Sequence, residues 1–210
     1  MKNNKKNKNR SLIKYGVFTI AVVVLFATGL HTEVIGFFQR GLLETGVMNP
    51  KIEQSREISK ATNTANESVN KLKKLPKADF NLKLRDPNGK IIPLSDLKGK
   101  VIFMNFWATW CPPCVAEMPS INQLHKEMGD EVAFVMLSLD RNFDKAISFK
   151  EKKDYELPIY APASKLPSMY ESSAIPTTYI IDADGNLALT HKGMADYNTD
   201  KFKNFLKSLQ

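Results

Sequence analysis

The chain has only two cysteines, Cys111 and Cys114, and they stand where a strand pattern gives way to a helix pattern. The nearly continuous apolar run at residues 101–106 is typical of a buried central strand. An apolar stripe with helical spacing follows in residues 112–128, so we expect a helix to begin next to Cys111. One helical turn brings the second sulfur alongside the first. A C-x-x-C pair in this context predicts a redox-active disulfide.

The two cysteines are expected to differ in role. The first turn of a helix leaves backbone N–H groups without partners, and these groups and the helix dipole favour a thiolate at its N-terminus. We therefore predict that Cys111 is the exposed, attacking sulfur and that Cys114 is the more buried, resolving one. The alternatives are a purely structural disulfide, two inert core cysteines, or half of a zinc site. Zinc would need two further ligands, and the three histidines, His31, His125 and His191, show no paired spacing, so no metal is expected.

Strand and helix patterns alternate from residue 78 onward. An alternating segment at 80–84 and an apolar pair at 91–92 flank the turn 86–89, which predicts an N-terminal β-hairpin. Strands are expected at Val132–Leu139, Leu157–Tyr160, Thr177–Asp182 and Asn186–Lys192, and helices at Asp144–Lys153 and Asp200–Leu209. This order predicts an α/β fold with a mixed central sheet and helices on both faces.

Three parts of the sequence resemble one family. They are LSDLKGKVIFMNFWATWCPPCVAEMP at residues 94–119, AIPTTYIIDADGNL at residues 174–187, and Gly193 after the last strand. Over residues 80–210 the chain is similar to the TlpA/ResA-like branch of the thioredoxin superfamily. The resemblance implies a thioredoxin-like fold, a disulfide reductase that works outside the cytoplasm, and no dissociable cofactor.

Carried over position by position, the resemblance makes Cys111 the nucleophile and Cys114 the resolver. Pro176 matches the cis-proline of the family, and cis peptides are almost confined to X-Pro bonds. The backbone of Ile175 would then face the sulfurs and pair with a substrate strand. Trp110 is expected to flank the exposed sulfur. The alternatives are a trans proline in an ordinary loop and a tryptophan that only packs.

Two positions differ from ordinary thioredoxins. Asn105 replaces the buried aspartate expected on the strand before the cysteines, and an amide cannot exchange a proton at neutral pH. Glu117 follows Cys114 by three residues, which places both side chains on one face of the helix, and TlpA/ResA-like proteins carry a glutamate here. We expect Glu117 to help take the proton from Cys114 during resolution. The alternative is a solvated carboxylate on the helix surface.

The dipeptide between the cysteines is Pro112-Pro113. Neither proline has an N–H group, so two potential hydrogen-bond donors to the Cys111 thiolate are absent. A less stabilised thiolate makes a better reductant. The sequence therefore predicts a reducing rather than an oxidising centre.

The residues before this domain have the pattern of a membrane anchor. A basic tail at residues 1–11 precedes an apolar segment at residues 12–30, which as a helix would span about 28 Å, close to the hydrocarbon core of a bilayer. The preceding cations predict a single-pass protein with a cytoplasmic N-terminus and a redox domain on the extracytoplasmic (periplasmic) side. A juxtamembrane segment and stalk at residues 31–76 would tether the thioredoxin-like domain at residues 77–210. A cleaved signal peptide and a buried core helix are the alternatives.

The formal net charge of +8 does not indicate a nucleic-acid-binding protein. Residues 75–210 contain 17 Lys and Arg and 17 Asp and Glu, so the positive excess lies in the tail and the stalk. A nucleic-acid-binding domain would carry a basic patch on its folded part. No nucleic-acid partner is therefore expected.

The leading functional hypothesis is a membrane-anchored thiol–disulfide oxidoreductase that reduces disulfides of exported proteins. The resemblance suggests apocytochrome c as a candidate substrate, and a membrane thiol carrier would have to supply the electrons. A thiol peroxidase is the second hypothesis, although the sequence lacks the Pro-x-x-x-Thr-x-x-Cys arrangement usual at peroxidatic sites. A tethered, non-catalytic binding module is the third, and the presence of both cysteines argues against it.

Overall fold

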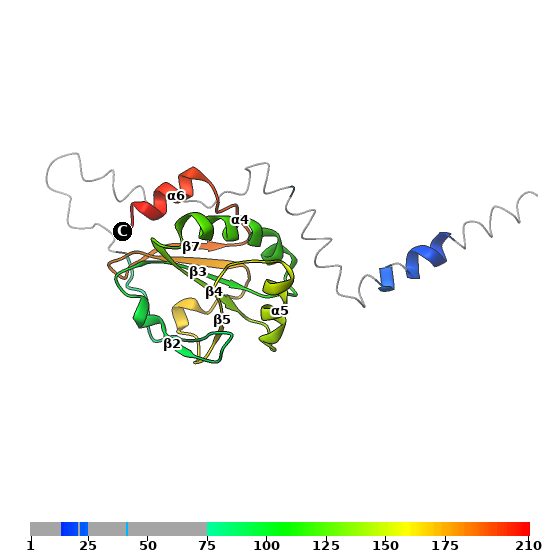
Figure 1. The fold of residues 1–210 in the computed structure, drawn as a ribbon, viewed down its shortest axis with the longest axis horizontal. Coiled ribbons are helices and arrows are strands. Elements are labelled where there is room, and N and C mark those ends of the chain that lie inside the picture. Colours follow the sequence, from blue (N-terminus) through cyan, green and yellow to red (C-terminus); the bar gives the residue numbers. More distant parts are fainter. Residues whose placement is uncertain (1–13, 21, 25–40, 42–74) are drawn as a thin grey trace, which may run out of the picture.

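The computed structural model describes residues 14–20, 22–24, 41 and 75–210 (Figure 1). The described stretches before residue 25 are helical, and no helix in the described part of the chain is both long and apolar enough to cross a membrane. The predicted tail lies outside the described residues, as do nearly all of the predicted stalk and part of the predicted anchor. The boundaries of these segments and of the domain at 77–210 stay predictions.

Seven strands form one mixed sheet in the order β2-β1-β5-β4-β3-β6-β7. The strands are β1 (Lys83–Arg85), β2 (Ile91–Pro93), β3 (Val101–Trp107), β4 (Val132–Ser138), β5 (Ile159–Pro162), β6 (Thr177–Ile181) and β7 (Leu187–Lys192). The inner strands β3, β4 and β5 run parallel, whereas the pairs β3–β6, β6–β7, β1–β5 and β1–β2 are antiparallel. The strand that leads to the cysteines, β3, is thus enclosed between β4 and β6.

Alternate side chains of β3 enter two separate cores, one on each face of the sheet. Phe103 and Trp107 belong to the first core, and Met104 and Phe106 belong to the second. All seven residues of β3 are buried. A strand that is covered on both faces reads as a continuous apolar run, which is why its position could be predicted.

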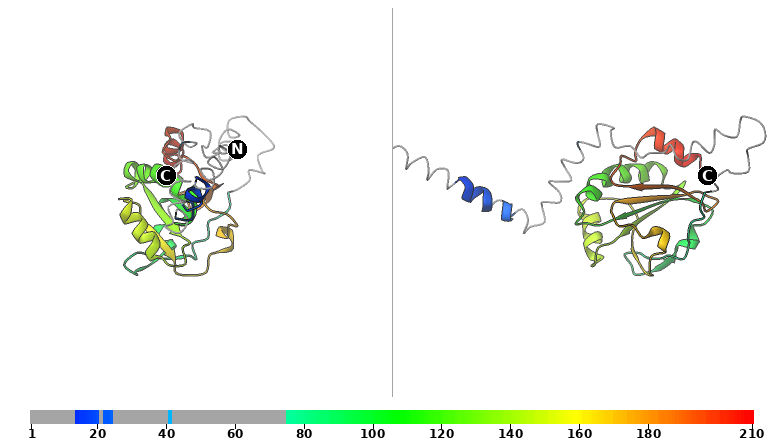
Figure 2. Two further views of the ribbon diagram at one scale, coloured as in Figure 1. Left: turned by 90° about the vertical axis from the view of Figure 1, so that its right-hand side faces the viewer. Right: turned by 180° about the vertical axis from the view of Figure 1, so that it is seen from behind.

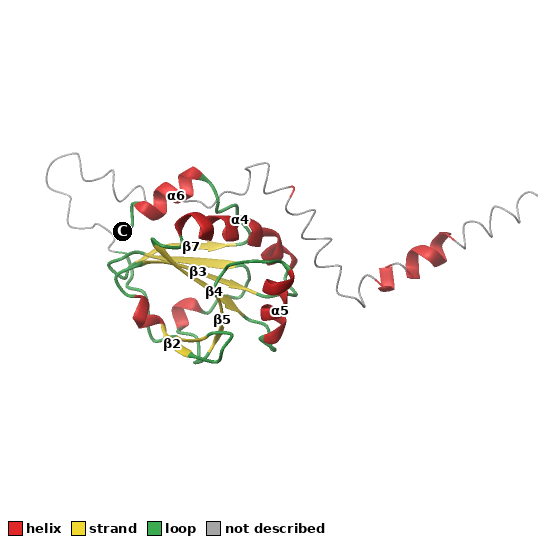
Figure 3. Cartoon of the chain, viewed as in Figure 1, coloured by secondary structure: helices red, strands yellow, loops and turns green. Residues whose placement is uncertain are grey.

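Helices lie on both faces of the sheet, as the sequence predicts. The long helices α4 (Pro112–Met128), α5 (Asp144–Lys152) and α6 (Asp200–Lys207) contribute to the first core, and α4 and α6 lie side by side in all views (Figures 1 and 2). The second core is closed by two short 3-10 helices, η3 (Leu94–Leu97) and η4 (Ser168–Tyr170), through the buried residues Leu94 and Tyr170. Figure 3 shows the sheet in yellow between these two layers.

The predicted elements are confirmed with small differences at their ends. The hairpin pairs Leu84 with Ile92, and α4 spans the predicted residues. The first strand begins at Lys83 rather than at residue 80. Its expected first residues do not join the ladder because the N–H of Asn81 donates to the carboxylate of Asp79, at 2.9 Å, which is a local turn contact. The two 3-10 helices were not predicted.

Candidate active site

The cysteine pair lies between the end of β3 and the start of α4. Cys111 and Cys114 form a disulfide, with their Cα atoms 5.3 Å apart. Cys111 is 4% exposed and Cys114 is fully buried. Trp110, in contrast, is 60% exposed, so this side chain stands open to solvent directly beside the less buried sulfur. The predicted exposure of Cys111 is therefore not seen in this disulfide form, in which both sulfur-bearing residues are buried and Cys111 is only slightly less so. The predicted roles of attacking and resolving sulfur stay predictions.

Cys111 is the N-cap residue of α4. Its Sγ accepts a hydrogen bond from the backbone N–H of Cys114 at 3.3 Å, and its carbonyl oxygen accepts one from Val115 at 3.1 Å. Pro112 and Pro113 occupy the first two positions of the helix and have no N–H group. The sulfur therefore receives one backbone donor from the first turn of α4, where a helix with other residues could offer more.

The loop before β6 lies next to Cys111. The peptide bond between Ile175 and Pro176 is cis, as the sequence predicts. The carbonyl oxygen of Ile175 lies 3.7 Å from Sγ of Cys111. The carbonyl oxygen of Pro176 accepts a hydrogen bond from Gly193 at 2.9 Å. Gly193 has a φ of +96°, a conformation that glycine adopts without strain, so the chain can turn here towards α4.

Asp140, which sequence reasoning missed, anchors the loop that leads to the cysteines. Its carboxylate accepts hydrogen bonds from the N–H of Thr109 at 3.0 Å and from the Thr109 hydroxyl at 2.7 Å. The hydroxyl of Ser138 donates to the same carboxylate at 2.9 Å. Because β3 and β4 are parallel, their carboxyl ends meet at one edge of the sheet. An aspartate directly after the β4 pattern was the available signal for this contact.

Glu117 points into the protein rather than into solvent. The residue is fully buried, so the alternative of a solvated helix carboxylate is wrong. Oε1 accepts a hydrogen bond from Nδ2 of Asn105 at 2.8 Å, and Oε2 accepts one from the N–H of Ala195 at 3.2 Å. Burial raises the pKa of Glu117 from its ordinary value of 4.5 to about 8, although both hydrogen bonds oppose this shift. This carboxyl group can therefore gain and lose a proton near neutral pH.

A buried polar network continues from Glu117 across the sheet, and sequence reasoning missed most of it. Nδ2 of Asn105 also donates to the hydroxyl of Thr178 at 2.9 Å. The hydroxyl of Tyr197 donates to the same Thr178 oxygen at 2.7 Å. Thr178 and Tyr197 are both fully buried. Burial raises the pKa of Tyr197 well above its usual value, and the charge of Glu117 raises it further, whereas the hydrogen bond to Thr178 opposes the shift.

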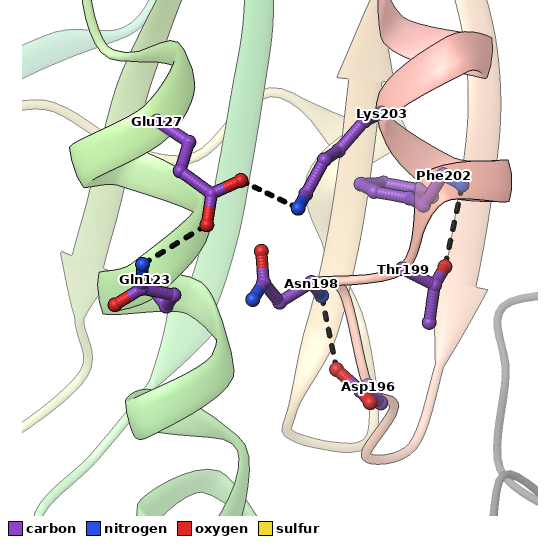
Figure 4. Close-up of polar contacts among 7 residues, drawn as sticks. All are labelled: Gln123, Glu127, Asp196, Asn198, Thr199, Phe202 and Lys203. Carbon is purple, nitrogen blue, oxygen red and sulfur yellow. Dashed lines mark hydrogen bonds and ion pairs between the residues drawn. The ribbon is translucent and has the colours of Figure 1, made fainter.

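The loop between β7 and α6 supplies two members of this network, and an ion pair links the helix that follows it to α4 (Figure 4). Lys203 of α6 forms an ion pair with Glu127 of α4. Gln123 donates to the same carboxylate at 2.9 Å. The hydroxyl of Thr199 caps α6 by accepting the N–H of Phe202 at 3.3 Å. The cap and the ion pair lie at the end of this loop, and its beginning bonds to Pro176 and Glu117.

The chemical groups of the site are two cysteine sulfurs, one buried carboxyl group and a cis-proline. In the part of the chain that the structure describes, no three His, Cys, Asp or Glu side chains are grouped so that they could hold a metal ion. Of the predicted site residues, the structure brings Ile175 to Cys111, and Trp110 is the chain neighbour of Cys111. Among the described residues the hydrogen bonds of the Glu117 side chain go to Asn105 and Ala195 rather than to a cysteine. The roles predicted for these residues are not tested by the geometry alone.

Known proteins similar to this chain carry thiol–disulfide chemistry. Residues 73–190 match the AhpC/TSA family. The thioredoxin-like protein YneN of Bacillus subtilis is 36% identical over 118 residues, which are 55% of this chain and 68% of that protein. The thiol-disulfide oxidoreductase ResA of Bacillus cereus is 33% identical over 133 residues, which are 61% of this chain and 75% of that protein. The crystal structure of the exposed lipoprotein thioredoxin of Streptococcus pneumoniae is 31% identical, with a TM-score of 0.52, and covers 60% of this chain and 98% of that one.

Proposed function

Since the chain belongs to the AhpC/TSA family and is a thiol–disulfide oxidoreductase of the ResA type, we propose that it reduces disulfides of exported proteins outside the cytoplasm. The observation that carries the proposal is the placement of Cys111 at the N-terminus of α4, with the Ile175 carbonyl 3.7 Å from its sulfur and with Cys114 buried behind it. In this arrangement the sulfur of Cys111 would meet a substrate strand, and the sulfur of Cys114 would resolve the mixed disulfide.

The proposed reaction transfers two electrons from the dithiol to the substrate. The thiolate of Cys111 attacks one sulfur of a substrate disulfide, and the other substrate sulfur leaves and takes up a proton. Cys114 then loses its proton and attacks the sulfur of Cys111. The disulfide between Cys111 and Cys114 forms, as in the structure, and the second substrate sulfur leaves as a thiol after protonation.

Glu117 is the proposed acceptor for the proton that Cys114 loses. The two residues are three positions apart on α4 and therefore share one face of the helix. A pKa of about 8 for Glu117 is close to the ordinary thiol pKa of about 8.5, which favours proton transfer between them. The exposed ring of Trp110 and the backbone of Ile175 are the proposed contacts for the substrate strand.

The centre is proposed to act as a reductant. A thiolate that receives fewer hydrogen bonds is less stable, and a less stable thiolate is oxidised more readily to the disulfide. The single N–H donor from the first turn, that of Cys114, supports this direction. Electrons would come from a membrane thiol carrier that reduces the disulfide again.

The extracytoplasmic location rests on the predicted anchor at residues 12–30 with its preceding cations. The name of the pneumococcal relative, an exposed lipoprotein, is consistent with a redox domain on that side. The test uses intact cells and a thiol reagent that cannot cross the membrane. After mild reduction, Cys111 of the full chain should react; a chain that reacts only after lysis would show that the proposed location is wrong.

The substrate is identified by a trap. Changing Cys114 to Ala leaves Cys111 able to attack but removes the resolving thiol, so exported substrates should stay bound through a reducible disulfide. The matched control, Cys111→Ala, should capture far less. Apocytochrome c among the captured proteins would support the narrower substrate assignment. Equal capture by both variants, or capture of cytoplasmic proteins alone, would refute the proposal.

A thiol peroxidase is the alternative that the same chain permits, because both reactions begin with a reactive thiolate. Thr109, the threonine that precedes the cysteines, donates its hydroxyl to Asp140 at 2.7 Å and is thus committed to a structural contact. Rates of oxidation of the reduced dithiol distinguish the two functions. We expect a protein disulfide to oxidise it faster than hydrogen peroxide does, and the opposite order would favour the peroxidase.

A further inference from the structure

A pocket of about 310 Å³ opens at the same edge of the sheet as the cysteines. Its lining comes from the turn between β1 and β2, from the segment that follows β4 and from the start of α5. One lining residue, Arg141, directly follows Asp140, and Trp110 directly follows Thr109. Because Asp140 accepts two hydrogen bonds from Thr109, Arg141 and Trp110 each stand one residue away from a fixed contact. The pocket therefore lies beside the loop that leads to Cys111.

Two arginines line this pocket, Arg85 from β1 and Arg141 from the segment after β4. The guanidinium group of Arg85 lies over the ring of Phe143, 6.0 Å from its centroid. This contact uses one face of the guanidinium group and leaves the N–H groups in its plane available. In the described part of the chain no carboxylate forms an ion pair with either arginine. Both guanidinium groups can therefore bind a carboxylate of another molecule.

Two aspartates also line the pocket, but local groups of the protein compensate their charge. Oδ1 of Asp86 accepts the backbone N–H groups of Asn88 and Lys90, each at 2.9 Å, and so closes the hairpin turn. Asp144 lies in the first turn of α5, where the helix dipole stabilises a negative charge. The two arginines have no such acceptor among the described residues. The pocket therefore favours an anionic ligand.

We propose that this pocket binds an acidic segment of the protein whose disulfide is reduced at Cys111. The inference rests on the proposed function, because it names the class of substrate that this function favours. A guanidinium group forms paired, planar hydrogen bonds with a carboxylate, so Asp or Glu residues near the substrate cysteine fit Arg85 and Arg141. Such contacts hold the substrate chain beside Trp110, and the opposite charges also speed its encounter with the site. The electron transfer stays at the two cysteines.

The test compares two synthetic peptides that each contain one internal disulfide. They are identical except that two Glu residues beside one cysteine are Gln in the second peptide. The full chain, supplied in reduced form, should reduce the acidic peptide with about fivefold higher kcat/KM, the effect of two exposed ion pairs. The difference should lie in KM, because the pocket binds the peptide but does not react. It should also disappear at about 1 M salt, where the Debye length is about 3 Å.

The matched variants remove two positive charges at either end of the sheet. Arg85→Gln combined with Arg141→Gln should abolish the preference for the acidic peptide, and each single change should reduce it. The control combines Lys77→Gln with Lys98→Gln. These lysines line a second pocket, of about 350 Å³, which lies beside the start of β3 and thus away from the cysteines. Lys98 also lies over an aromatic ring, at 5.0 Å from its centroid. The control should keep the full preference.

Three results would overturn the proposal. The first is equal kcat/KM for the two peptides with the native chain. The second is a preference that survives in the folded arginine variants, where each single change serves if the double variant does not fold. The third is an equal loss in the lysine control, which would show that net charge alone is responsible. A native chain that reduces neither peptide would instead refute the proposed function.

Discussion

Replacement of Glu117 by Gln should make the protein more stable, and the gain should grow with pH. The native carboxyl group is fully buried and has its pKa raised by burial from 4.5 to about 8. Between these two values the unfolded chain releases the proton and the folded chain retains it. The folded state therefore binds more protons, and the free energy of unfolding falls as pH rises through this window. A glutamine cannot ionise, so the free energy of unfolding of the variant does not fall in this way.

The size of the effect follows from the two pKa values. Each pH unit between 4.5 and about 8 costs the native protein about 1.4 kcal/mol relative to the glutamine variant. The difference should therefore be near zero below pH 4.5, about 2 kcal/mol at pH 6 and about 4 kcal/mol at pH 8. The amide can keep a hydrogen bond at each of its two ends, because its oxygen can accept from Ala195 while its NH₂ group donates to Oδ1 of a reversed Asn105.

Urea unfolding of both oxidised proteins at several pH values measures this difference. Subtracting the two curves of unfolding free energy against pH cancels the contribution of every other titrating group. A raised pKa of Glu117 requires the two curves to separate steadily from about pH 4.5 upwards. Parallel curves would refute the assignment of a raised pKa to Glu117, and a native protein that gains stability relative to the variant would refute its sign.

Three further changes test the contacts around the site by urea unfolding. Asp140→Ala removes the acceptor of three hydrogen bonds and should cost about 1–3 kcal/mol; a loss below the error of the assay would contradict the anchoring role of Asp140. Phe202→Ala truncates a fully buried ring and should cost about 3–5 kcal/mol. Lys203→Ala removes a partly exposed ion pair with Glu127 and should cost less than about 1 kcal/mol. If Lys203→Ala proved as damaging as Phe202→Ala, packing would not be what holds α6 to the sheet.

Much of the fold could be predicted because its strongest signals are local. The run at β3 is apolar throughout since both faces of that strand are covered, and α4 begins where the two prolines permit a helix to start. The 3-10 helices were missed because three or four residues carry too little periodicity to be recognised. The thioredoxin-like family could be named from the residues around the cysteines and is confirmed by the relatives.

In the site, only the residues that belong to a recognisable sequence motif could be predicted. Cys111, Cys114 and Pro176 are marked by spacing and neighbours, whereas the hydrogen bonds of Glu117 and of the network beyond it come from β3, β6 and the loop after β7. The bonds from Ala195 and Tyr197 join residues 78 and 19 positions apart in the chain. No local pattern encodes such pairs, because they depend on how the loop after β7 folds back over α4. For the same reason the burial of Glu117 was left open at the sequence level.

Cys111 and Cys114 are proposed to form a reducing centre, because the sulfur of Cys111 receives a single N–H donor from the first turn of α4. The most direct test is the midpoint potential of this disulfide, measured on the full chain in glutathione buffers of graded composition. For a reducing centre we expect a potential more negative than about −200 mV, in the range of glutaredoxins and thioredoxin. A potential of about −120 mV, the value of the strong oxidant DsbA, would refute the reducing role.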